Sequence, residues 1–438
     1  MDNKIGIRKW LSFLLAGFVG QIAWAIENNY LNLFVYHTSP TAAVSTFIPL
    51  MTALSAVTAT ITTLFMGALS DRLGKRKLFI SFGYLIWGLS IILFAFLDPT
   101  GNITLIGGAN AAMLAGAMIV IADCIMTFFG STANDAAFNA YVTDNTNSNN
   151  RGKVEAVLSI LPLFAVIIVV VPGDMIVKNL GWDMFFYIFG ALTTVIGIVC
   201  LFLFPREDLQ PNKEEPYLKN IIHGFRPKVI KENPKLYLAL LSFMVFNIAI
   251  QVFMPYLMVY IQHTLTVDFI ITVASVIGTA SIITVVLGAF MDKIGKNRII
   301  FPALAAATIG GILMTFLTDQ IGVIIGCTLL MAGYLICTAV LGAKVRDYTP
   351  VNQAGLFQGV RMVFVVMIPM VTGPYIGSGV SNINRVEYWN EDYQMNELRP
   401  NNLIFLFTAI VLVLALIPII FLIRKEKADE QQNQQASE

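Results

Sequence analysis

The feature that most constrains this chain is a series of apolar stretches of about 20 residues each, separated by short polar loops. Such a length, at ~1.5 Å per helical residue, covers ~30 Å of hydrocarbon. The chain is 57% hydrophobic and only 13% charged, which excludes a water-soluble globular fold. We expect an all-α integral membrane protein with twelve transmembrane helices, at about 10–35, 44–66, 78–97, 118–142, 153–173, 183–204, 236–261, 269–290, 299–317, 321–343, 355–377 and 402–423.

The positive charges predict the orientation of these helices. Of the 28 Lys and Arg residues, 24 fall at the termini or in the loops that follow even-numbered helices; the opposite loops hold Lys178, Arg385 and Arg399. Cytoplasmic loops carry an excess of Lys and Arg. Both termini are therefore expected in the cytoplasm, with the protein in the cell membrane. The first apolar stretch is too long for a signal-peptide core, so we expect it to remain as a helix.

The expected organisation is two six-helix bundles joined by a linker. The N-terminal bundle covers 1–204, a cytoplasmic linker rich in Lys, Glu and Pro covers 205–235, and the C-terminal bundle covers 236–423. Residues 424–438 form a cytoplasmic tail, whose polar end we expect to be disordered. We interpret the apolar residues 105–117 as an external extension of the third and fourth helices.

A glycine-punctuated basic loop occurs twice. Each copy has a Gly, an Asp four residues later, a cation beside it, a second Gly and further cations. The members are Gly67, Asp71, Arg72, Gly74 and Arg76 in the first copy and Gly288, Asp292 and Gly295 in the second. One copy alone is consistent with a simple positive hairpin between membrane helices. Two copies in matching contexts indicate pseudo-symmetric halves with a site between them.

In these loops the sequence resembles the major facilitator superfamily, which has this pattern between helices 2 and 3 and again between helices 8 and 9. The resemblance covers nearly the whole chain. Further repeats support it, since Glu27 recurs at a fixed offset as Gln251 and Asp144 recurs as Asp347. The resemblance implies parallel repeats and a central cavity lined by both halves.

We interpret the two loops as a cytoplasmic latch. The leading glycines let helices approach closely, and Asp71 can lie at a helix N-terminus, where the partial positive charge favours it. Arg72 and Arg76 are expected to reach carboxylates such as Glu155.

An acidic residue inside a membrane span is costly unless it is paired, protonated or hydrated, so it indicates function. Glu27 is the strongest candidate, beside a polar face of helix 1. Polar residues can also hold neighbouring helices together. The second repeat has Gln251 at this place, so only the first-half member of this pair can carry a proton.

Asp135 is the second candidate, inside helix 4, unless that helix ends near Gly130 and Asp135 is a solvated cap. Asp123 lies nearer the outer end and ranks lower. Arg361, in apolar helix 11, needs an anion, for which Asp135 is the first choice and Glu155 the second.

Helices 1, 4 and 11 resemble the sugar:cation symporter branches, namely the glycoside-pentoside-hexuronide symporters and the proton-coupled sucrose carriers. The stretches that carry this resemblance are 21–28, 134–141 and 150–155. It implies that Glu27, Asp135 and Arg361 serve substrate and coupling ion. Sodium-using members have two acids on helix 2, where residues 54–64 here offer only Ser and Thr. A proton is therefore the expected coupling ion rather than sodium.

A sugar is the expected substrate. An aromatic face can cover the apolar face of a pyranose while amides satisfy its hydroxyls. Trp24 fits the first role, although tryptophans in membrane helices also serve in packing. The expected substrate walls are Gln21, Trp24, Asn28, Asn32, Asn139, Asn247 and Gln251.

Other classes fit less well. The glycine spacing and Arg76 do not match a phosphate-binding loop, and the four cysteines show no disulfide or metal spacing. We expect no enzyme activity, cofactor, metal or nucleic-acid partner, and function as a monomer in the bilayer. The alternatives are a proton-coupled drug or metabolite efflux antiporter and a non-transporting receptor on a transporter scaffold.

The latch interpretation predicts that Asp71→Asn slows transport while leaving substrate binding largely intact, because the latch acts on opening and not on the substrate site. Turnover and equilibrium binding measured on the same purified protein check this. Unchanged turnover would count against a latch.

Overall fold

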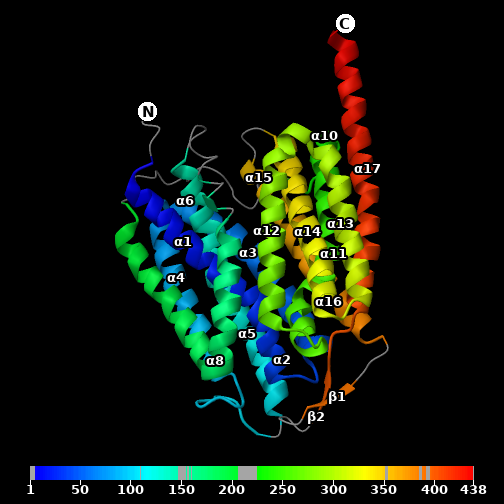
Figure 1. The fold of residues 1–438 in the computed structure, drawn as a ribbon. Helices are drawn as coiled ribbons and strands as arrows, with labels where there is room; N and C mark the ends of the chain where they lie inside the picture. Colours follow the sequence, from blue (N-terminus) through cyan, green and yellow to red (C-terminus); the bar gives the residue numbers. More distant parts are fainter. Residues whose placement is uncertain are drawn as a thin grey trace. The chain divides into compact units, whose positions relative to one another are not determined.

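The computed structural model describes residues 5–108, 110–146, 154, 157–158, 160–205, 224–350, 354–383, 387–390 and 395–437, most of them helical (Figure 1). The chain divides into two compact units. Unit 1 holds Met1–Glu215 and Val386–Leu398, and unit 2 holds Pro216–Arg385 and Arg399–Glu438.

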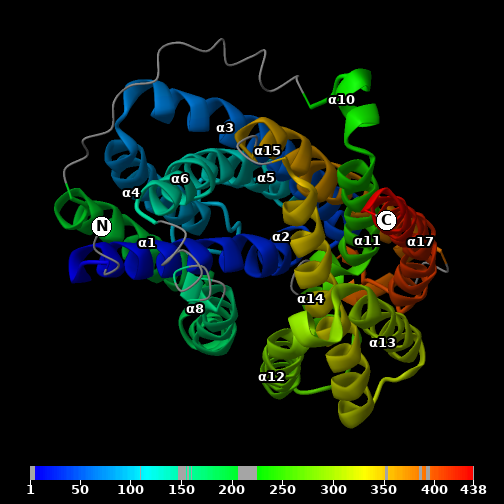
Figure 2. The same cartoon turned by 90° about the horizontal axis from the view of Figure 1, so that it is seen from above.

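Unit 1 is a helical bundle with one added hairpin. In chain order its described elements are α1 (Ile7–Ala25), η1 (Ile26–Tyr30), α2 (Leu31–Thr38), η2 (Ala43–Phe47), α3 (Ile48–Leu73), α4 (Arg76–Leu93), η3 (Phe94–Phe96), α5 (Ala111–Gly130), η4 (Ser131–Phe138), α6 (Asn139–Asp144), α8 (Leu161–Leu203), β1 (Glu387–Asn390) and β2 (Met395–Leu398). The two strands pair antiparallel with Glu387 opposite Leu398. Helix α8 packs along α4 and α1, and α3 packs against α5 and η4 (Figure 2).

Unit 2 is a second helical bundle. Its described elements are α10 (Pro227–Glu232), α11 (Pro234–Val259), η5 (Tyr260–Thr264), α12 (Phe269–Ile294), α13 (Lys296–Phe316), α14 (Gln320–Tyr348), α15 (Ala354–Met362), η6 (Val363–Met367), α16 (Ile368–Ser381) and α17 (Leu403–Ser437). Helix α11 packs against α16 and α17, and α14 packs against α12 and α13 (Figure 2).

Eleven helices in the described part of the chain are long and apolar enough to cross a membrane. One of them, α8, runs over 43 residues, about twice what a bilayer requires. Its backbone leaves helical geometry at Gly181, where φ is 88° and ψ is 171°. That conformation is essentially restricted to glycine. Helix α8 is therefore two helices that meet at Gly181, which agrees with the predicted twelve crossings.

Two predicted segments differ from the structure. Residues 105–108 and 110 are not helical, and the fourth helix begins only at Ala111. The C-terminal tail is helical to Ser437 rather than disordered. Ion pairs explain the second difference, since Asp429 binds both Lys425, one turn earlier, and Lys235 of α11. These contacts hold the polar end of α17 against the bundle.

Five membrane helices in the described part of the chain contain π-helical segments, in which one turn holds an extra residue. They are η1 in the first helix and η4 in the fourth, followed by η2 at the start of the second, η5 in the seventh and η6 in the eleventh. Such segments occur frequently at functional sites because they redirect side chains and loosen backbone bonding. The first two carry the acidic candidates Glu27 and Asp135, and η4 continues directly into α6. Asp135 therefore lies inside a continuous helical path and is not a cap at its end.

The loop between the third and fourth helices is fixed by two buried carboxylates. Asp98 is 4% exposed; it lies 3.1 Å from His37 Nε2 and accepts hydrogen bonds from the backbone and side chain of Thr100. Asp183 of α8 accepts from the backbone and side chain of Asn102. Burial raises the pKa of Asp98, but the hydrogen bonds and the charge of His37 outweigh it, so the pKa is lowered.

Asp98→Asn is expected to destabilise the detergent-purified protein by about 1 to 2 kcal/mol at neutral pH, because the charged acceptor is lost. A carboxyl group whose pKa is lower in the folded than in the unfolded protein stabilises the fold at every pH above its unfolded-state pKa, which is about 4. That stabilisation is lost as the pH falls through the folded-state pKa. The difference in Tm between wild type and variant should therefore shrink below about pH 4. The exposed Glu232→Gln is the control; a Tm difference for Asp98→Asn that stays constant with pH would contradict this assignment.

Candidate functional site

Glu27 lies on η1 and is 7% exposed. One of its carboxylate oxygens, Oε1, lies 2.6 Å from the Ser55 hydroxyl of α3 and 3.1 Å from the Thr127 hydroxyl of α5. The two hydroxyls are themselves 2.8 Å apart. Glu27 Oε2 is buried and has no hydrogen-bond partner within the described residues. Glu27 thus faces the interior of unit 1 and contacts two other helices through hydroxyl groups.

Asp123 of α5 is a second buried carboxylate in this region. It is 1% exposed and interacts electrostatically with Glu27. Ser55 also lies beside it, and the Ser55 hydroxyl makes its short hydrogen bond, 2.6 Å, to Glu27. Neither oxygen of Asp123 has a hydrogen-bond donor among the described residues. Sequence reasoning ranked Asp123 low because of its position along the helix, whereas its neighbours make it part of the Glu27 environment.

Asp135 lies on η4 and is half-buried. The hydroxyl of Ser131, one turn earlier, donates a hydrogen bond of 3.0 Å to its carboxylate. Asn139, which is exposed, donates to the backbone oxygen of Asp135 at 3.1 Å. Asp135 also interacts electrostatically with Glu27. Glu27 therefore interacts with two other acidic residues of unit 1, Asp123 and Asp135.

The predicted substrate residues of helix 1 are engaged to different degrees. The half-buried Trp24 donates from its ring nitrogen to Asn134 at 3.4 Å, and its ring lies 5.0 Å from that of Trp87. Asn28 is exposed, and its amide donates to the Trp24 backbone. Asn32 is buried with its side-chain oxygen unpaired within the described chain. Trp24 combines packing contacts with partial exposure, so both of its predicted roles stay open.

Gln21 and the candidate site residues of unit 2 differ in their exposure and contacts. Gln21, Asn247 and Gln251 are each half-buried. The Asn247 amide donates to the Val365 backbone oxygen in η6 at 2.8 Å, which ties α11 to the eleventh helix. Arg361 is exposed on α15 and has an interaction partner. Its predicted pairing with Asp135 stays a prediction.

The first basic loop forms an ion pair within unit 1. Arg76 Nε lies 2.5 Å from Asp144 Oδ2, at the end of α6, and Arg76 also donates to Ser70 at 3.2 Å. Gly74 has φ of 61°, in the left-handed region that favours glycine, and its N–H closes the end of α3. Arg72 is exposed. At Gly67, a Cβ would lie 3.9 Å from the Cβ of Ala136, an ordinary contact, so this approach does not require glycine.

Other latch residues lie outside the described residues or have no described side chain. Glu155 is not described, and the side chains of Asp71 and residues 288–293, including Asp292, are not described either. The latch roles predicted for these residues stay predictions.

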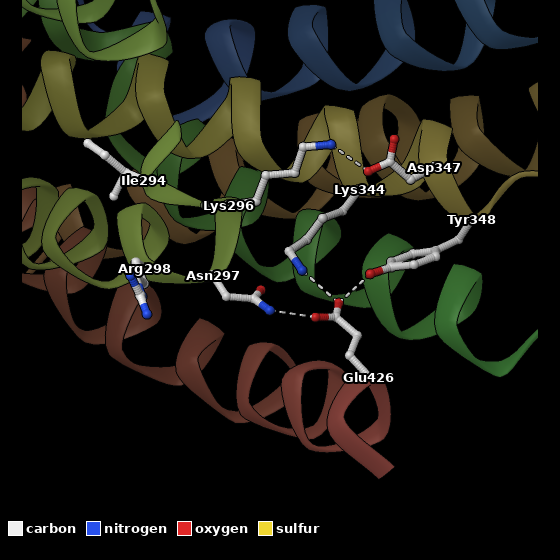
Figure 3. A pocket seen from close by; sticks show the side chains of 9 residues that line it. Ile294, Lys296, Asn297, Arg298, Lys344, Asp347, Tyr348 and Glu426 are labelled. Atoms are coloured by element: carbon white, nitrogen blue, oxygen red, sulfur yellow. Dashed lines mark hydrogen bonds and ion pairs between the residues drawn. The ribbon is translucent and has the colours of Figure 1, made fainter. Parts of the chain in front are cut away.

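The second loop forms a related cluster in unit 2. Gly295 has φ of 94°, and Lys296 beside it lies 2.5 Å from Asp347. Glu426 of α17 accepts hydrogen bonds from Lys344, Asn297 and Tyr348 (Figure 3). These residues line a cavity of about 520 Å³, together with Ile294 and Arg298. In both units a cation after the second glycine of the loop thus binds an aspartate at the end of a later helix. Arg76 binds Asp144 at the end of the fourth membrane helix, and Lys296 binds Asp347 at the end of the tenth.

No group of three His, Cys, Asp or Glu side chains suited to a metal occurs in the part of the chain that the structure describes. The four cysteines are not disulfide-bonded.

The fold and these buried polar clusters define a multi-pass α-helical membrane protein. The family model of the Major Facilitator Superfamily matches residues 10–374, so the chain belongs to that superfamily. It is therefore a membrane transporter of small molecules, and the family predicted from the repeated loops is confirmed. A search of curated proteins finds no match.

Solved structures of transporters share the fold. A D-xylose–proton symporter has 18% identity and a TM-score of 0.67, with 94% of this chain and 97% of that chain covered. The xylose transporter XylE from E. coli has 14% identity and a TM-score of 0.65, with 92% and 97% covered. A variant of the nucleoside transporter NupG has 12% identity and a TM-score of 0.66, with 94% and 99% covered. At these identities the likeness shows the fold alone.

Sequence reasoning missed the hydroxyls that surround Glu27. Ser55 and Thr127 are common residues in membrane helices, and nothing in their local sequence separates them from other hydroxyls. One signal was available, since Asp123 and Thr127 are four residues apart and therefore share a helix face. Only packing shows that this face turns toward Glu27.

The Arg76–Asp144 pair gives a prediction about stability. Arg76→Gln and Asp144→Asn should each lower the Tm, and the double variant should lose less than the sum, with a coupling of about 1 kcal/mol, because both changes remove one partly buried contact. The matched control is the exposed Lys228–Glu232 pair, whose atoms are 4.0 Å apart and which should show no measurable coupling. Additive losses at Arg76 and Asp144 would mean that the contact does not stabilise this conformation.

Proposed function

We propose that this protein is a secondary active transporter that imports a sugar or glycoside together with protons, by alternating access. Glu27 is the proton carrier. The observation that carries this proposal is a buried carboxyl group on a π-helical segment, with hydroxyl groups as its hydrogen-bond partners. A membrane transporter needs to remove the charge of such a group before it moves through a closed state.

A count of hydrogens supports a proton on Glu27. Glu27 Oε1, Ser55 Oγ and Thr127 Oγ1 lie within 3.1 Å of one another, so three hydrogen bonds are geometrically available. The two hydroxyls supply one hydrogen each. A proton on Glu27 supplies the hydrogen atom for the third hydrogen bond. If Glu27 is ionised, one of the three short oxygen–oxygen contacts has no hydrogen atom between its oxygens.

The side chains near Glu27 support a polar, ring-shaped substrate. Trp24 is half-buried, Asn28 is exposed, and Asn32 has an unpaired buried oxygen. Aromatic and amide groups together suit a sugar. Two of the solved transporters with this fold carry xylose according to their descriptions, and a third carries nucleosides, which contain a sugar. Gln21, Asn139, Asn247 and Gln251 complete the proposed substrate walls.

Several further parts of the proposal follow from the sequence. Asp135 and Arg361 form a charge pair that responds to substrate, and the basic loops act as the cytoplasmic latch. Both termini lie in the cytoplasm of a cell that carries the protein in its plasma membrane. The monomer is the working unit, and a proton rather than sodium is the coupling ion.

The test is uptake into proteoliposomes under an imposed proton gradient, after a thermal-shift screen that includes D-xylose and other monosaccharides and glycosides. Glu27→Gln should bind substrate and exchange it across the membrane, but its accumulation should fall to the level reached without a gradient, because glutamine cannot carry a proton. Glu232→Gln should accumulate like the wild type. If Glu27→Gln still accumulates substrate against its gradient, the assignment of the proton carrier is wrong.

The direction of proton movement separates import from efflux. Symport should make the outside medium more alkaline when substrate is added outside, because protons enter with it. Proton release on the side of substrate addition would favour the efflux antiporter instead.

A further inference from the structure

We propose that Glu27 and Asp123 act as one titrating pair that holds at least one proton in this conformation, which makes Asp123 a second coupling residue. The inference rests on the proposed proton-coupled transport and assigns a role to a carboxyl group that this mechanism does not otherwise use. It is carried by the burial of the two side chains, by the Ser55 and Thr127 hydroxyls that contact Glu27, and by the lack of donors to Asp123 among the described residues.

The two carboxylates lie in the same layer of unit 1. Glu27, Asp123 and Ser55 each lie eleven or twelve residues from the nearer end of their membrane helix. Asp123 shares a helix face with Thr127, one turn later, and Thr127 contacts Glu27 at 3.1 Å. The electrostatic interaction between Asp123 and Glu27 agrees with this arrangement.

The available donors do not satisfy both groups as charged carboxylates. Ser55 and Thr127 both make their hydrogen bonds to Glu27 Oε1. Glu27 Oε2 and both oxygens of Asp123 are buried and lack donors within the described chain. An ionised carboxylate is an acceptor only, and leaving it buried without donors costs several kcal/mol. At least one of the two groups must therefore be neutral or bind a cation.

The charged surroundings point the same way. The titratable groups that interact electrostatically with the pair are Asp135 on η4 and the Cys124 thiol on α5. Neither is a cation, and within the described residues no Lys, Arg or His forms an ion pair with Glu27 or Asp123. When two buried carboxyl groups interact and no cation balances them, both cannot stay ionised, so at least one keeps a proton.

The second repeat shows that the fold does not require this cluster. Helix α3 and helix α12 have the same bounds when shifted by 221 residues, and Asp144 corresponds to Asp347 at a shift of 203. With these shifts, Ser55, Asp123 and Thr127 correspond to Val276, Gly326 and Leu330. Glu27 corresponds to Gln251, so none of the four equivalent residues in unit 2 can titrate. Unit 2 forms the same bundle with these residues, so the polar cluster of unit 1 is not needed for packing.

The proton balance follows directly. With one proton the pair has a charge of −1; uptake of a second proton from water neutralises it, and release restores the charge. The pair therefore exchanges one proton per cycle between a singly and a doubly protonated state. Neutralisation removes the last buried charge of the pair and permits the transition through the closed state.

The test is pH-difference infrared spectroscopy of the purified, substrate-free protein, following the carbonyl stretch of buried protonated carboxyl groups. The wild type should show two titration steps separated by about one pH unit or more, because the two sites interact. Glu27→Gln and Asp123→Asn should each show one step, at a pH between the two wild-type steps, and the double variant should show neither. Glu232→Gln should leave both steps unchanged. Asp123→Ala provides a second variant if Asp123→Asn does not fold.

Three outcomes would overturn the inference. The first is a single step in the wild type, and the second is an unchanged Glu27 step in Asp123→Asn. The third is a titration that moves with sodium when sodium replaces choline at constant ionic strength, since the cluster would then be a sodium site. Because no substrate is present, these results are separate from uptake. Accumulation of substrate by Glu27→Gln would contradict the proposed function. If Asp123→Asn changes neither the uptake nor the infrared titration of Glu27, only the proposed pair is wrong.

Discussion

The structure depends most on the cost of burying charge in a low-dielectric interior. Within unit 1, Glu27 and Asp123 lie among apolar helices, and among the described residues two hydroxyls are the hydrogen-bond partners of Glu27. Such a cluster is expensive unless protons or ions complete it. The same cost explains the other buried acids, since Asp98 has His37 and Thr100 and Glu426 has Lys344. Glu27 and Asp123, which form no ion pair with a cation among the described residues, are therefore suited to carry protons.

The two repeats share a framework and differ in chemistry. Each has a glycine with positive φ after the second or eighth helix, and each has a cation that binds an aspartate at the end of the fourth or tenth helix. These contacts fix how three helices meet at one end of the bundle. The titratable cluster is confined to the first repeat, where Ser55, Asp123 and Thr127 surround Glu27. The two halves therefore keep matched helix packing while only the first has buried carboxyl groups at these positions.

Much of the architecture was predictable because it follows from local and additive properties. Span lengths, the positive charges of the loops and the repeated Gly-Asp pattern led to twelve crossings and to the superfamily that the family model confirms. Errors occurred where long-range contacts decide. The C-terminal tail has a polar composition typical of disorder, but it is helical, and Asp429 forms ion pairs with Lys235 of α11 and with Lys425 one turn earlier. The apolar residues Leu105 and Ile106 lie in a loop, which follows two residues held by buried carboxylates, Thr100 by Asp98 and Asn102 by Asp183.

The sequence by itself determined that this chain is a twelve-helix membrane protein with two related halves, because hydropathy and periodicity act within each helix and need no knowledge of its neighbours. It also identified Glu27, since any acid in an apolar span is conspicuous. Only the tertiary structure decided what Glu27 touches. Ser55, Asp123 and Thr127 come from helices that are 28 to 100 residues away in the chain, and rotation of each helix about its axis, which packing sets, brings their polar faces together.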